Sequence, residues 1–579
     1  MPNLIRMPAA VALYLLVSAS AFSLFPGGRY LPAPTGSLVH RHPQSLKSPT
    51  RAPSSPNRAL LNVATSEVPP PSNNRSSSRI RQLFSAFAAL WKALATFTSQ
   101  RILWPNSAPD ASVSAPLPPS TMGCPLFGHN ILAGSKHHGP YVFFANAAKK
   151  LGNPKIFRYF AFGFPFVSVS GKDNIKATLK GEFDPDGINT MTVSEGMSLV
   201  FGTESILYQN DKKKHALLRR LAGQAMTPVA LRKAVPTIQA TAEEVIDKYF
   251  LELLDAGSDS SITMENLMDE FTMDIARNQI LGLEIEEDEL ETFEKNTSDW
   301  INGIFNPLLM IPGIPKFVAR STKGGRARAY LVSKLEERLE YLATLDESDG
   351  SSLGAMFFAV DEDGNKLSRE QLIDNALILI LAGTETSSST LTVASLLLGL
   401  HPDIYQRLRE EQQALQAKHG DTMTMELLDE ECPYLDAVIR ETMRLKPIDG
   451  LVERQPKKTL VVDGTQIPQK NIVYVNIRQT HADDPKTFLE DGSHMDIYKG
   501  FNPDRWLDDE TKPSEWMGFG EGQRRCLGER LAMCEMKIFL ASLARKVDEY
   551  TLANGDNEIL WNPISVMARP SDGVEVVLK

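Results

Sequence analysis

The sequence predicts a mainly α-helical protein with a minor β-sheet. Segments of helical period recur along the chain after about residue 118, and one capped apolar segment is long enough to cross a whole domain. Strand-like runs are few and short. The composition, 42% hydrophobic and 23% charged over 579 residues, is that of a globular protein with a large core. Because no repeat or second linker interrupts residues 118–579, one domain is expected there.

The N-terminal part has the composition of a targeting sequence. Residues 1–109 hold eleven Lys or Arg but one acid, Glu67, which leaves the rest of the chain with a net charge of about −20. Such an acidic body makes nucleic acid a poor partner. The apolar run at residues 9–22 follows Arg6 and is short for a bilayer span, so we expect a signal or transit-type presequence over residues 1–75. An uncleaved membrane anchor is the alternative.

Residues 76–117 combine an amphipathic helix with a Pro-rich linker. Between residues 78 and 104, apolar side chains recur at helical spacing among four cations, which predicts a helix lying on a membrane surface. A helix packed on the main domain is the alternative. Five prolines between residues 105 and 119 disfavour helix and predict a semi-rigid spacer.

The elements of the large domain follow from periodicity. Strand patterns occupy residues 164–171, 458–464 and 471–477. Helical patterns occupy residues 236–257, 326–345, 402–420, 434–447 and 527–547.

One further helix differs from the others. It opens with Ser368 and Gln371 in capping-box register and ends before Pro402, which allows a helix about 48 Å long. Its flanks are apolar, but its middle reads Ala382-Gly383-Thr384-Glu385-Thr386. A glycine and a buried acid are both unfavourable in a core helix, so this break predicts a site where small residues admit a ligand and an acid and an alcohol pass protons. An exposed polar stripe is the alternative.

A cysteine lies between glycines and arginines near the C-terminus. The chain has four cysteines, at positions 124, 432, 526 and 534, too few and too irregular for a disulfide framework. Cys526 ends the pattern Phe519-x-x-Gly522-x-Arg524-x-Cys526-x-Gly528, and a helical pattern follows. Upstream, Glu441 and Arg444 lie three apart on one helix, and Arg505 lies in the stretch FNPDRW. Alone, the Glu441–Arg444 pair would be a solvated face.

In this order and spacing, the motifs closely resemble those of the haem-thiolate monooxygenases, the cytochromes P450. The resemblance covers about residues 118–579 and implies the cytochrome P450 fold, haem b with iron held by the Cys526 thiolate, and insertion of one oxygen atom of O2 into a lipophilic substrate. A thiolate at Cys526 would lie near a helix N-terminus, which favours its negative charge. Cys534, eight residues later, is expected to be a packing residue.

The resemblance also assigns roles to individual residues. Phe519, Gly522, Arg524 and Gly528 would form the cofactor-binding loop, with Arg524 on a haem propionate. His215, Arg219 and Arg454 are further propionate candidates, for which a plain surface position is the alternative. Glu441, Arg444 and Arg505 would form a buried charge network that supports the cysteine loop. Ala382, Gly383, Glu385 and Thr386 would line the site of catalysis.

Substrate and partners are less closely defined. The hinge LPPSTMG, the loop MIPGIPKFVARS and the stretch EMKIF are similar to the branch of the family that oxidises retinoids, sterols and other isoprenoids. Apolar segments at residues 185–208 and 296–317 are expected to line the substrate pocket. Arg524, Arg525 and Arg530 beside the cysteine would suit docking of an acidic ferredoxin or a flavin-containing reductase. Charges committed to haem propionates and helix ends are the alternative for some of them. A haem-thiolate hydroperoxide isomerase or dehydratase and a haem-based sensor are the alternative functions.

The presequence gives the first testable prediction. Residues 19–22, Ala-Ser-Ala-Phe, resemble the cleavage motif of presequences used by complex plastids. Residues 1–75 fused to a fluorescent protein are therefore expected to carry it to a plastid, as fluorescence microscopy would show. Reticular fluorescence would contradict this and favour the alternative location, the endoplasmic reticulum membrane.

Overall fold

The computed structural model describes residues 108–578 except for short segments at 124–127, 132–134, 140–141, 162–163, 191–194, 257–260, 305, 311–313, 449–451, 470, 556–557 and 563–566. The predicted presequence and the helix at residues 78–104 lie outside the described residues. Helices make up most of the described chain, as the sequence predicts. They are α3 (Ser135–His138), α4 (Val142–Lys150), α5 (Lys172–Leu179), α6 (Glu195–Phe201), α7 (Lys212–Ala222), α8 (Pro228–Ala256), α9 (Met264–Ile275), α10 (Glu287–Ile304), α11 (Lys316–Ser321), α12 (Lys323–Leu342), α13 (Ser352–Phe358), α14 (Arg369–Leu400), α15 (Pro402–His419), α16 (Met425–Glu430), α17 (Pro433–Leu445), α18 (Ile477–Ala482) and α19 (Glu529–Lys546).

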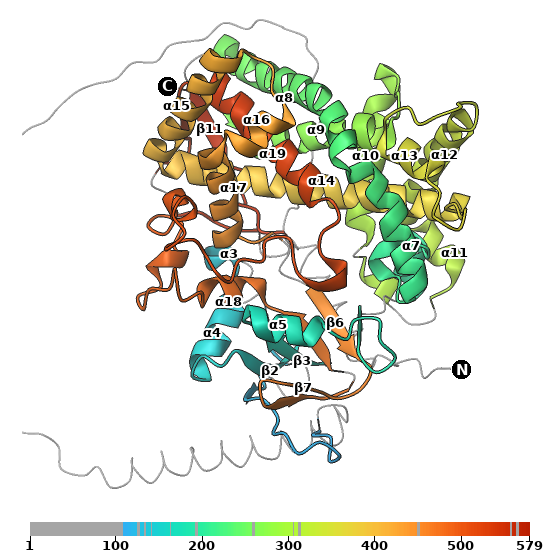
Figure 1. Ribbon diagram of the computed structural model, residues 1–579, viewed down its shortest axis with the longest axis vertical. Helices are drawn as coiled ribbons and strands as arrows, with labels where there is room; N and C mark the ends of the chain where they lie inside the picture. The colour runs from blue at the N-terminus through green and yellow to red at the C-terminus, as the bar shows by residue number, and fades with distance from the viewer. Residues whose placement is uncertain are drawn as a thin grey trace, which may run out of the picture. The chain divides into compact units, whose positions relative to one another are not determined.

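A six-stranded mixed sheet lies at one end of the helical body (Figure 1). Its strand order is β1-β2-β3-β9-β6-β4, with β1 (Ser120–Thr121), β2 (Ile156–Ala161), β3 (Phe164–Val169), β9 (Ile472–Val475), β6 (Val452–Pro456) and β4 (Ile188–Thr190). A three-stranded sheet joins β10 (Tyr550–Leu552), β11 (Glu575–Leu578) and β5 (Ile262–Thr263), and β7 (Leu460–Val462) pairs with β8 (Thr465–Ile467) in a hairpin.

Two helices cover opposite faces of the large sheet. On one face, Phe144 of α4 stacks on Tyr474 of β9 with ring centroids 4.4 Å apart. On the other face, Ile175 and Leu179 of α5 belong to the same apolar cluster as Val167 of β3. Side chains alternate between faces along a strand, so Arg454 shares the α5 face with Val473, its antiparallel partner on β9. The sheet therefore directs Arg454 toward α5.

Helix α14 crosses the middle of the helical body behind α17 and α19 (Figure 1). Its predicted capping box is present, because the Ser368 hydroxyl accepts from the Gln371 N–H at 3.2 Å and the Gln371 amide oxygen accepts from the Ser368 N–H at 3.0 Å. Its length and hydropathy would allow it to cross a bilayer, but 67% of its most apolar window is buried inside the protein. It is the core helix of the described domain.

Helix α8 starts earlier than the sequence predicts. The pattern indicated a start at Pro236, which is wrong, because α8 begins at Pro228 and Pro236 lies inside it. Thr227 caps the true start, since its hydroxyl accepts from the Ala230 N–H at 3.3 Å. Two prolines eight residues apart each fit a first helical position, and periodicity alone does not separate them.

Part of the predicted Pro-rich linker lies on the β7–β8 hairpin. The Asp110 N–H donates to the Gln466 side-chain oxygen at 2.7 Å, and the Gln466 N–H donates to the Pro116 carbonyl at 2.8 Å. The described part of the linker is therefore hydrogen-bonded to the β7–β8 hairpin.

Candidate active site

The cysteine loop, residues 519–528, presents one thiol to solvent. Cys526 is exposed and follows the short helix η9 (Gly522–Arg524), and α19 begins three residues later. The backbone N–H of Cys526 donates to the Phe519 carbonyl at 3.0 Å, which closes the loop. Because the N–H groups at a helix start favour negative charge, this position favours the thiolate.

Two glycines give the loop its tight path. Gly520 and Gly522 have φ of 75° and 80°, in the left-handed region that other residues rarely adopt. Gly528 differs, because its φ is −86° and a Cβ there would meet no described atom within 4 Å. The open space beside Gly528 fits a flat group lying against the loop. The sequence pattern indicated Gly522 and Gly528 but missed Gly520.

The other described cysteines are buried in the core. Burial raises the pKa of Cys432 to about 11 and that of Cys534 to about 12. Both remain protonated thiols at neutral pH, and a thiol must lose its proton to bind a metal. Among the described cysteines, Cys526 is therefore the candidate ligand.

Next to the loop, one buried carboxylate holds two arginines. Glu182, just after α5, is fully buried, and its Oε1 accepts from Arg454 Nε at 2.8 Å and lies 3.0 Å from Arg524 Nε. Arg524 also donates to the backbone carbonyls of Ile206, Leu207 and Gln209. Both arginine side chains are more than nine-tenths buried. Arg524 is therefore an interior residue, and no sequence motif indicated Glu182.

Helix α7 adds two more residues, His215 and Arg219, to the surroundings of Glu182. His215 is buried and its ring lies 4.6 Å from that of Phe183, which also contacts Arg524. Burial, and then the positive charges of Arg524, Arg219 and Arg454, lower the pKa of His215 to about 4, so its ring is neutral at pH 7. Burial lowers the pKa of the half-buried Arg219, against the attraction of Cys526 and Glu182.

The arginine cluster (Glu182, His215, Arg219, Arg454 and Arg524) has two positive charges in excess. Three guanidinium groups face one carboxylate. Within the described part of the chain, the Arg219 guanidinium group has no hydrogen-bond or ion-pair partner, and Glu182 Oε2 is buried without a hydrogen bond. Two added carboxylates would neutralise the cluster, and guanidinium binds carboxylate well. These residues therefore fit the two propionates of haem.

A second buried charge network supports the loop from the other side. Glu441 and Arg444 are fully buried on α17, and Arg444 donates to both Glu441 oxygens, at 2.8 Å and 2.9 Å. Arg505 Nε and Trp506 Nε1 each donate to Glu441 at 2.9 Å. The structure thus brings together the three predicted residues and adds Trp506, the last residue of the motif FNPDRW, to which the sequence assigned no role.

Aromatic contacts join this network to the cysteine loop. The rings of Trp506 and Trp516 meet edge to face at 5.6 Å, and Trp516 meets Phe519 at 6.0 Å. Since the Phe519 carbonyl accepts the N–H of Cys526, the contacts continue to the thiol residue.

The polar middle of α14 is a regular helix. The Thr386 hydroxyl donates to the Ala382 carbonyl at 2.6 Å, one turn back, and Ala382 is exposed. Gly383 has a packing reason, because a Cβ there would lie 3.1 Å from Ile280 Cδ1. The small residue thus allows the segment at Ile280 to approach α14.

Glu385 belongs to a partly buried charge cluster that the sequence did not predict. Its Oε2 lies 3.3 Å from Arg569 Nη2, and Arg569 Nη1 lies 2.6 Å from Glu265 and 3.2 Å from Asp269 on α9. Arg569 also donates to the Ser389 hydroxyl at 2.6 Å. Burial raises the pKa of Glu385, Arg569 opposes this, and the other two acids add to it.

The two segments predicted to line the substrate pocket pack on each other. Trp300 of α10 donates its indole N–H to the Val200 carbonyl of α6 at 2.7 Å, inside an apolar cluster that includes both residues. Gly196 is needed there, because a Cβ would lie 2.5 Å from the Leu309 carbonyl oxygen. Segments distant in sequence therefore form one apolar wall.

Comparison with known proteins shows where this arrangement recurs. Residues 118–557 match the family described as Cytochrome P450. Cytochrome P450 26A1 of Gallus gallus is 29% identical over 506 residues, which cover 83% of this chain and 92% of that protein. Putative cytochrome P450 120 of Synechocystis is 30% identical over 375 residues, or 63% of this chain and 77% of that protein. The solved structure of retinoic acid bound cyanobacterial CYP120A1 matches with a TM-score of 0.64 and 27% identity, over 80% of this chain and 100% of that one.

The two cysteines near the C-terminus can be told apart by substitution. Cys526→Ala is expected to abolish thiolate ligation, and with it the strongly red-shifted Soret band of the reduced protein under carbon monoxide. Cys534→Ala should leave that spectrum unchanged and cost at most about 3 kcal/mol of core packing, measured by unfolding. The reverse pattern would show that Cys534 binds the iron.

Proposed function

Because this chain belongs to the cytochrome P450 family, we propose that it is a membrane-associated plastid monooxygenase that inserts one atom of O2 into a lipophilic isoprenoid. The family uses haem with an axial cysteine thiolate, and the exposed thiol of Cys526 supports that role. The acid–alcohol pair Glu385 and Thr386 carries the proposal, because an oxygenase needs protons delivered inside the protein. A hydroperoxide isomerase or a haem sensor has no such need.

Each part of the site has a task in this reaction. Haem, when bound, supplies the reductive activation of O2. Arg219, Arg454 and Arg524 bind its propionates, and Cys526 provides the thiolate on the side of α19. The contacts that lead from Glu441 through Trp506 and Trp516 to Phe519 hold the Cys526 thiol at a fixed position. The apolar wall of α6 and α10 orients the substrate and excludes water.

Protons reach the site through α14. Burial raises the pKa of the Glu385 carboxyl above its usual value, against the attraction of Arg569, so this carboxyl holds a proton more readily than an unperturbed glutamate does. The side chain is about one-third exposed, which gives it access to water. The Thr386 hydroxyl donates to the Ala382 carbonyl and keeps its own lone pairs for a second hydrogen bond. An acid and a neighbouring hydroxyl together make a relay.

The relatives support an isoprenoid substrate. Retinoic acid is the ligand of the solved cyanobacterial protein, and 7,8-epoxymelianol synthase CYP88A154 of Ailanthus altissima is 27% identical over 79% of this chain. The substrate class proposed here is therefore a large, mostly apolar isoprenoid.

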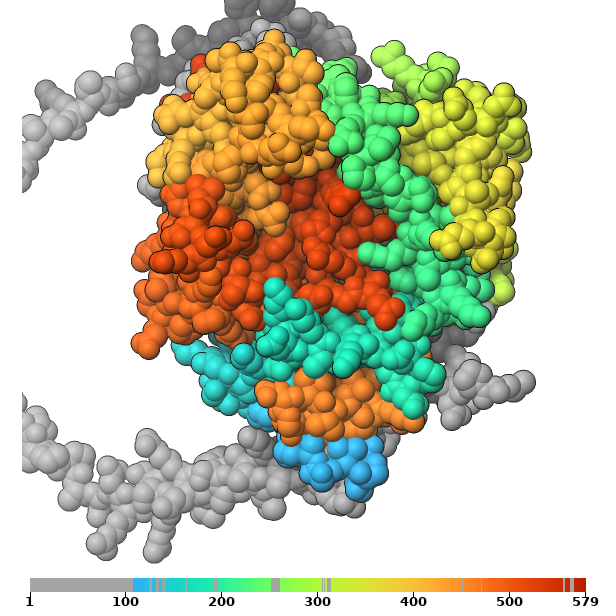
Figure 2. Space-filling model, viewed as in Figure 1, coloured from blue at the N-terminus to red at the C-terminus, as the bar shows by residue number. Residues whose placement is uncertain are grey.

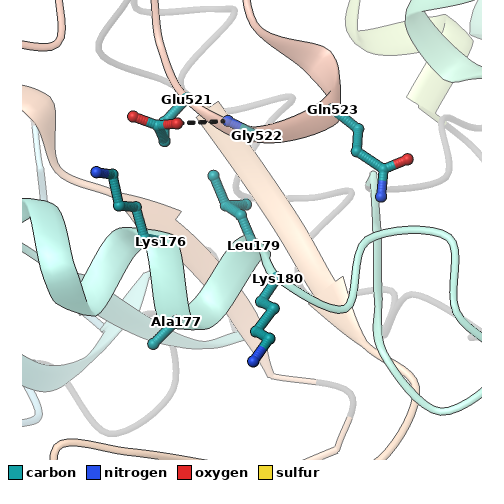
Figure 3. Close-up of a pocket in the computed structure, with 7 residues that line it drawn as sticks. All are labelled: Lys176, Ala177, Leu179, Lys180, Glu521, Gly522 and Gln523. Atoms are coloured by element: carbon teal, nitrogen blue, oxygen red, sulfur yellow. Dashed lines mark hydrogen bonds between the residues drawn. The ribbon is translucent and has the colours of Figure 1, made fainter.

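Electrons enter beside the cysteine loop, at a face rich in lysine. The C-terminal segment that carries the loop reaches the surface there between α5 and α7 (Figure 2). A surface pocket of about 430 Å³ lies where α5 meets the loop, lined by Lys176 and Lys180 of the α5 segment and by Glu521 and Gln523 of the loop (Figure 3). These lysines suit an acidic donor such as ferredoxin. Arg524 takes no part, because it is bound to Glu182 in the interior.

Membrane contact is proposed at the start of α11. Phe317 is 73% exposed and Leu308, nine residues earlier, is 43% exposed. Lys316 and Arg320 flank Phe317 as exposed cations. Large apolar side chains next to cations are typical of surfaces that rest on a bilayer. The same helix borders the apolar wall, so a lipophilic substrate would enter from the membrane.

The relay gives a prediction about coupling. Thr386→Ala is expected to keep the fold, because alanine is the better helix former, and to keep haem and substrate binding. It should divert electrons to hydrogen peroxide, since the hydroxyl of the relay is lost. Product formed per reductant consumed measures this. Unchanged coupling in both Thr386→Ala and Glu385→Gln would remove the relay and favour the isomerase.

The lysine face gives a prediction about the electron donor. Lys180→Glu is expected to raise the KM for ferredoxin and to weaken its dependence on salt, because an attractive charge becomes repulsive. Stopped-flow reduction at several salt concentrations measures both. Lys295→Glu, an exposed lysine on α10 away from this pocket, is the matched control. Equal effects of the two variants would rule out docking at this face.

A further inference from the structure

The arginine cluster contains an anion that binding of haem does not require. Propionates are attracted by Arg219, Arg454 and Arg524, and a buried carboxylate among these residues repels them. Glu182 nevertheless lies fully buried at the centre of the cluster. Glu182 carries the same negative charge as the propionates, so its role in the site must be something other than attracting them.

Glu182 joins two segments that are far apart in sequence. Its Oε1 holds Arg454 of β6 at 2.8 Å and Arg524 of the cysteine loop at 3.0 Å. Each arginine side chain is at most 8% exposed, so each needs an anion inside the protein. Glu182 Oε2 is buried and, within the described chain, accepts no hydrogen bond. The carboxylate therefore has unused capacity on the side away from the two arginines.

The backbone around Glu182 is strained in a way that fixes this corner. Phe183 has φ of 70°, a left-handed conformation that is costly for a bulky aromatic residue. In return, its ring lies 4.5 Å from the Arg524 guanidinium and 4.6 Å from the ring of His215. Such strain persists only where the surrounding contacts demand it. The Glu182–Phe183 corner is therefore a built part of the cluster.

We propose that Glu182 is a positioning residue: it is the resident counter-anion of Arg454 and Arg524, and the haem propionates share these two arginines with it. Its negative charge then has two effects on the bound haem. It opposes addition of an electron, which lowers the reduction potential, and it repels the propionates, which weakens haem retention. This inference requires haem binding by the family site and goes beyond the proposed substrate and reaction.

The test uses the purified holoenzyme and two charge variants. Glu182→Gln keeps the shape and removes the negative charge, so the midpoint potential is expected to rise and haem transfer to apomyoglobin to slow. A unit charge at about 10 Å in a partly buried site changes an equilibrium constant on the order of tenfold. Arg454→Gln should shift both quantities in the opposite direction. The potential is the decisive readout, because a purely structural contact would leave it unchanged.

Asp184→Asn is the matched control. Asp184 lies two residues away, but it is exposed and its ion pair with Lys212 is on the surface, so solvent screens its charge. Its loss should leave the potential unchanged. A wild-type potential in Glu182→Gln, or haem loss faster than in the wild type, would overturn the proposal.

A double variant keeps the test open if Glu182→Gln yields no holoenzyme. Glu182→Gln with Arg454→Gln removes one charge of each sign, so its potential is expected to match that of the wild type. A potential as low as that of Arg454→Gln alone would overturn the proposal, because it would show that the Glu182 charge is not felt at the haem.

Discussion

One buried carboxylate, that of Glu441, holds together the part of the structure on which the cysteine depends. It accepts hydrogen bonds from Arg444 on its own helix and from Arg505 and Trp506 sixty residues later. Buried ion pairs add little net stability, because desolvation offsets their attraction. What they provide is direction, since a charged hydrogen bond fixes distance and angle where apolar contact fixes neither. Most residues of the cysteine loop are exposed or half-buried, so apolar packing alone would not fix the position of the Cys526 thiol. The directional hydrogen bonds to Glu441 therefore matter for the loop.

The same arrangement recurs twice around the site. Glu182 joins β6 to the cysteine loop, and Arg569 joins α9 to α14. In each case the partners are far apart in sequence. The apolar clusters supply the driving force for folding, which does not depend on direction. The charges then fix where the functional side chains lie. Removing one partner leaves the other buried and unpaired, at a cost of about 3–5 kcal/mol.

The sequence predicted the elements with strong local signals and missed those that depend on distant contacts. The capping box at Ser368 and the run of apolar residues defined α14 from end to end, and the spacing around Cys526 located the loop. Glu182 and Arg569 carry no local signal, because each is a single charged residue in an ordinary stretch and acquires its role only when other segments reach it. Arg524 shows the opposite case. Its charge beside the cysteine indicated a docking surface, but folding brings it against Glu182 in the interior.

Crowding of charge distinguishes Glu385, the acid proposed to handle protons, from the other acids on α14. Glu265, Asp269 and Glu385 share one guanidinium, that of Arg569, in a largely buried place. Burial, and then repulsion from the neighbouring carboxylates, raises the pKa of Glu265 and of Glu385 against the attraction of Arg569. Glu385 has the most exposed side chain of the three and is the neighbour of Thr386 on α14. The proposed relay at Glu385 and Thr386 therefore depends on the charges gathered around Arg569 as much as on the acid itself.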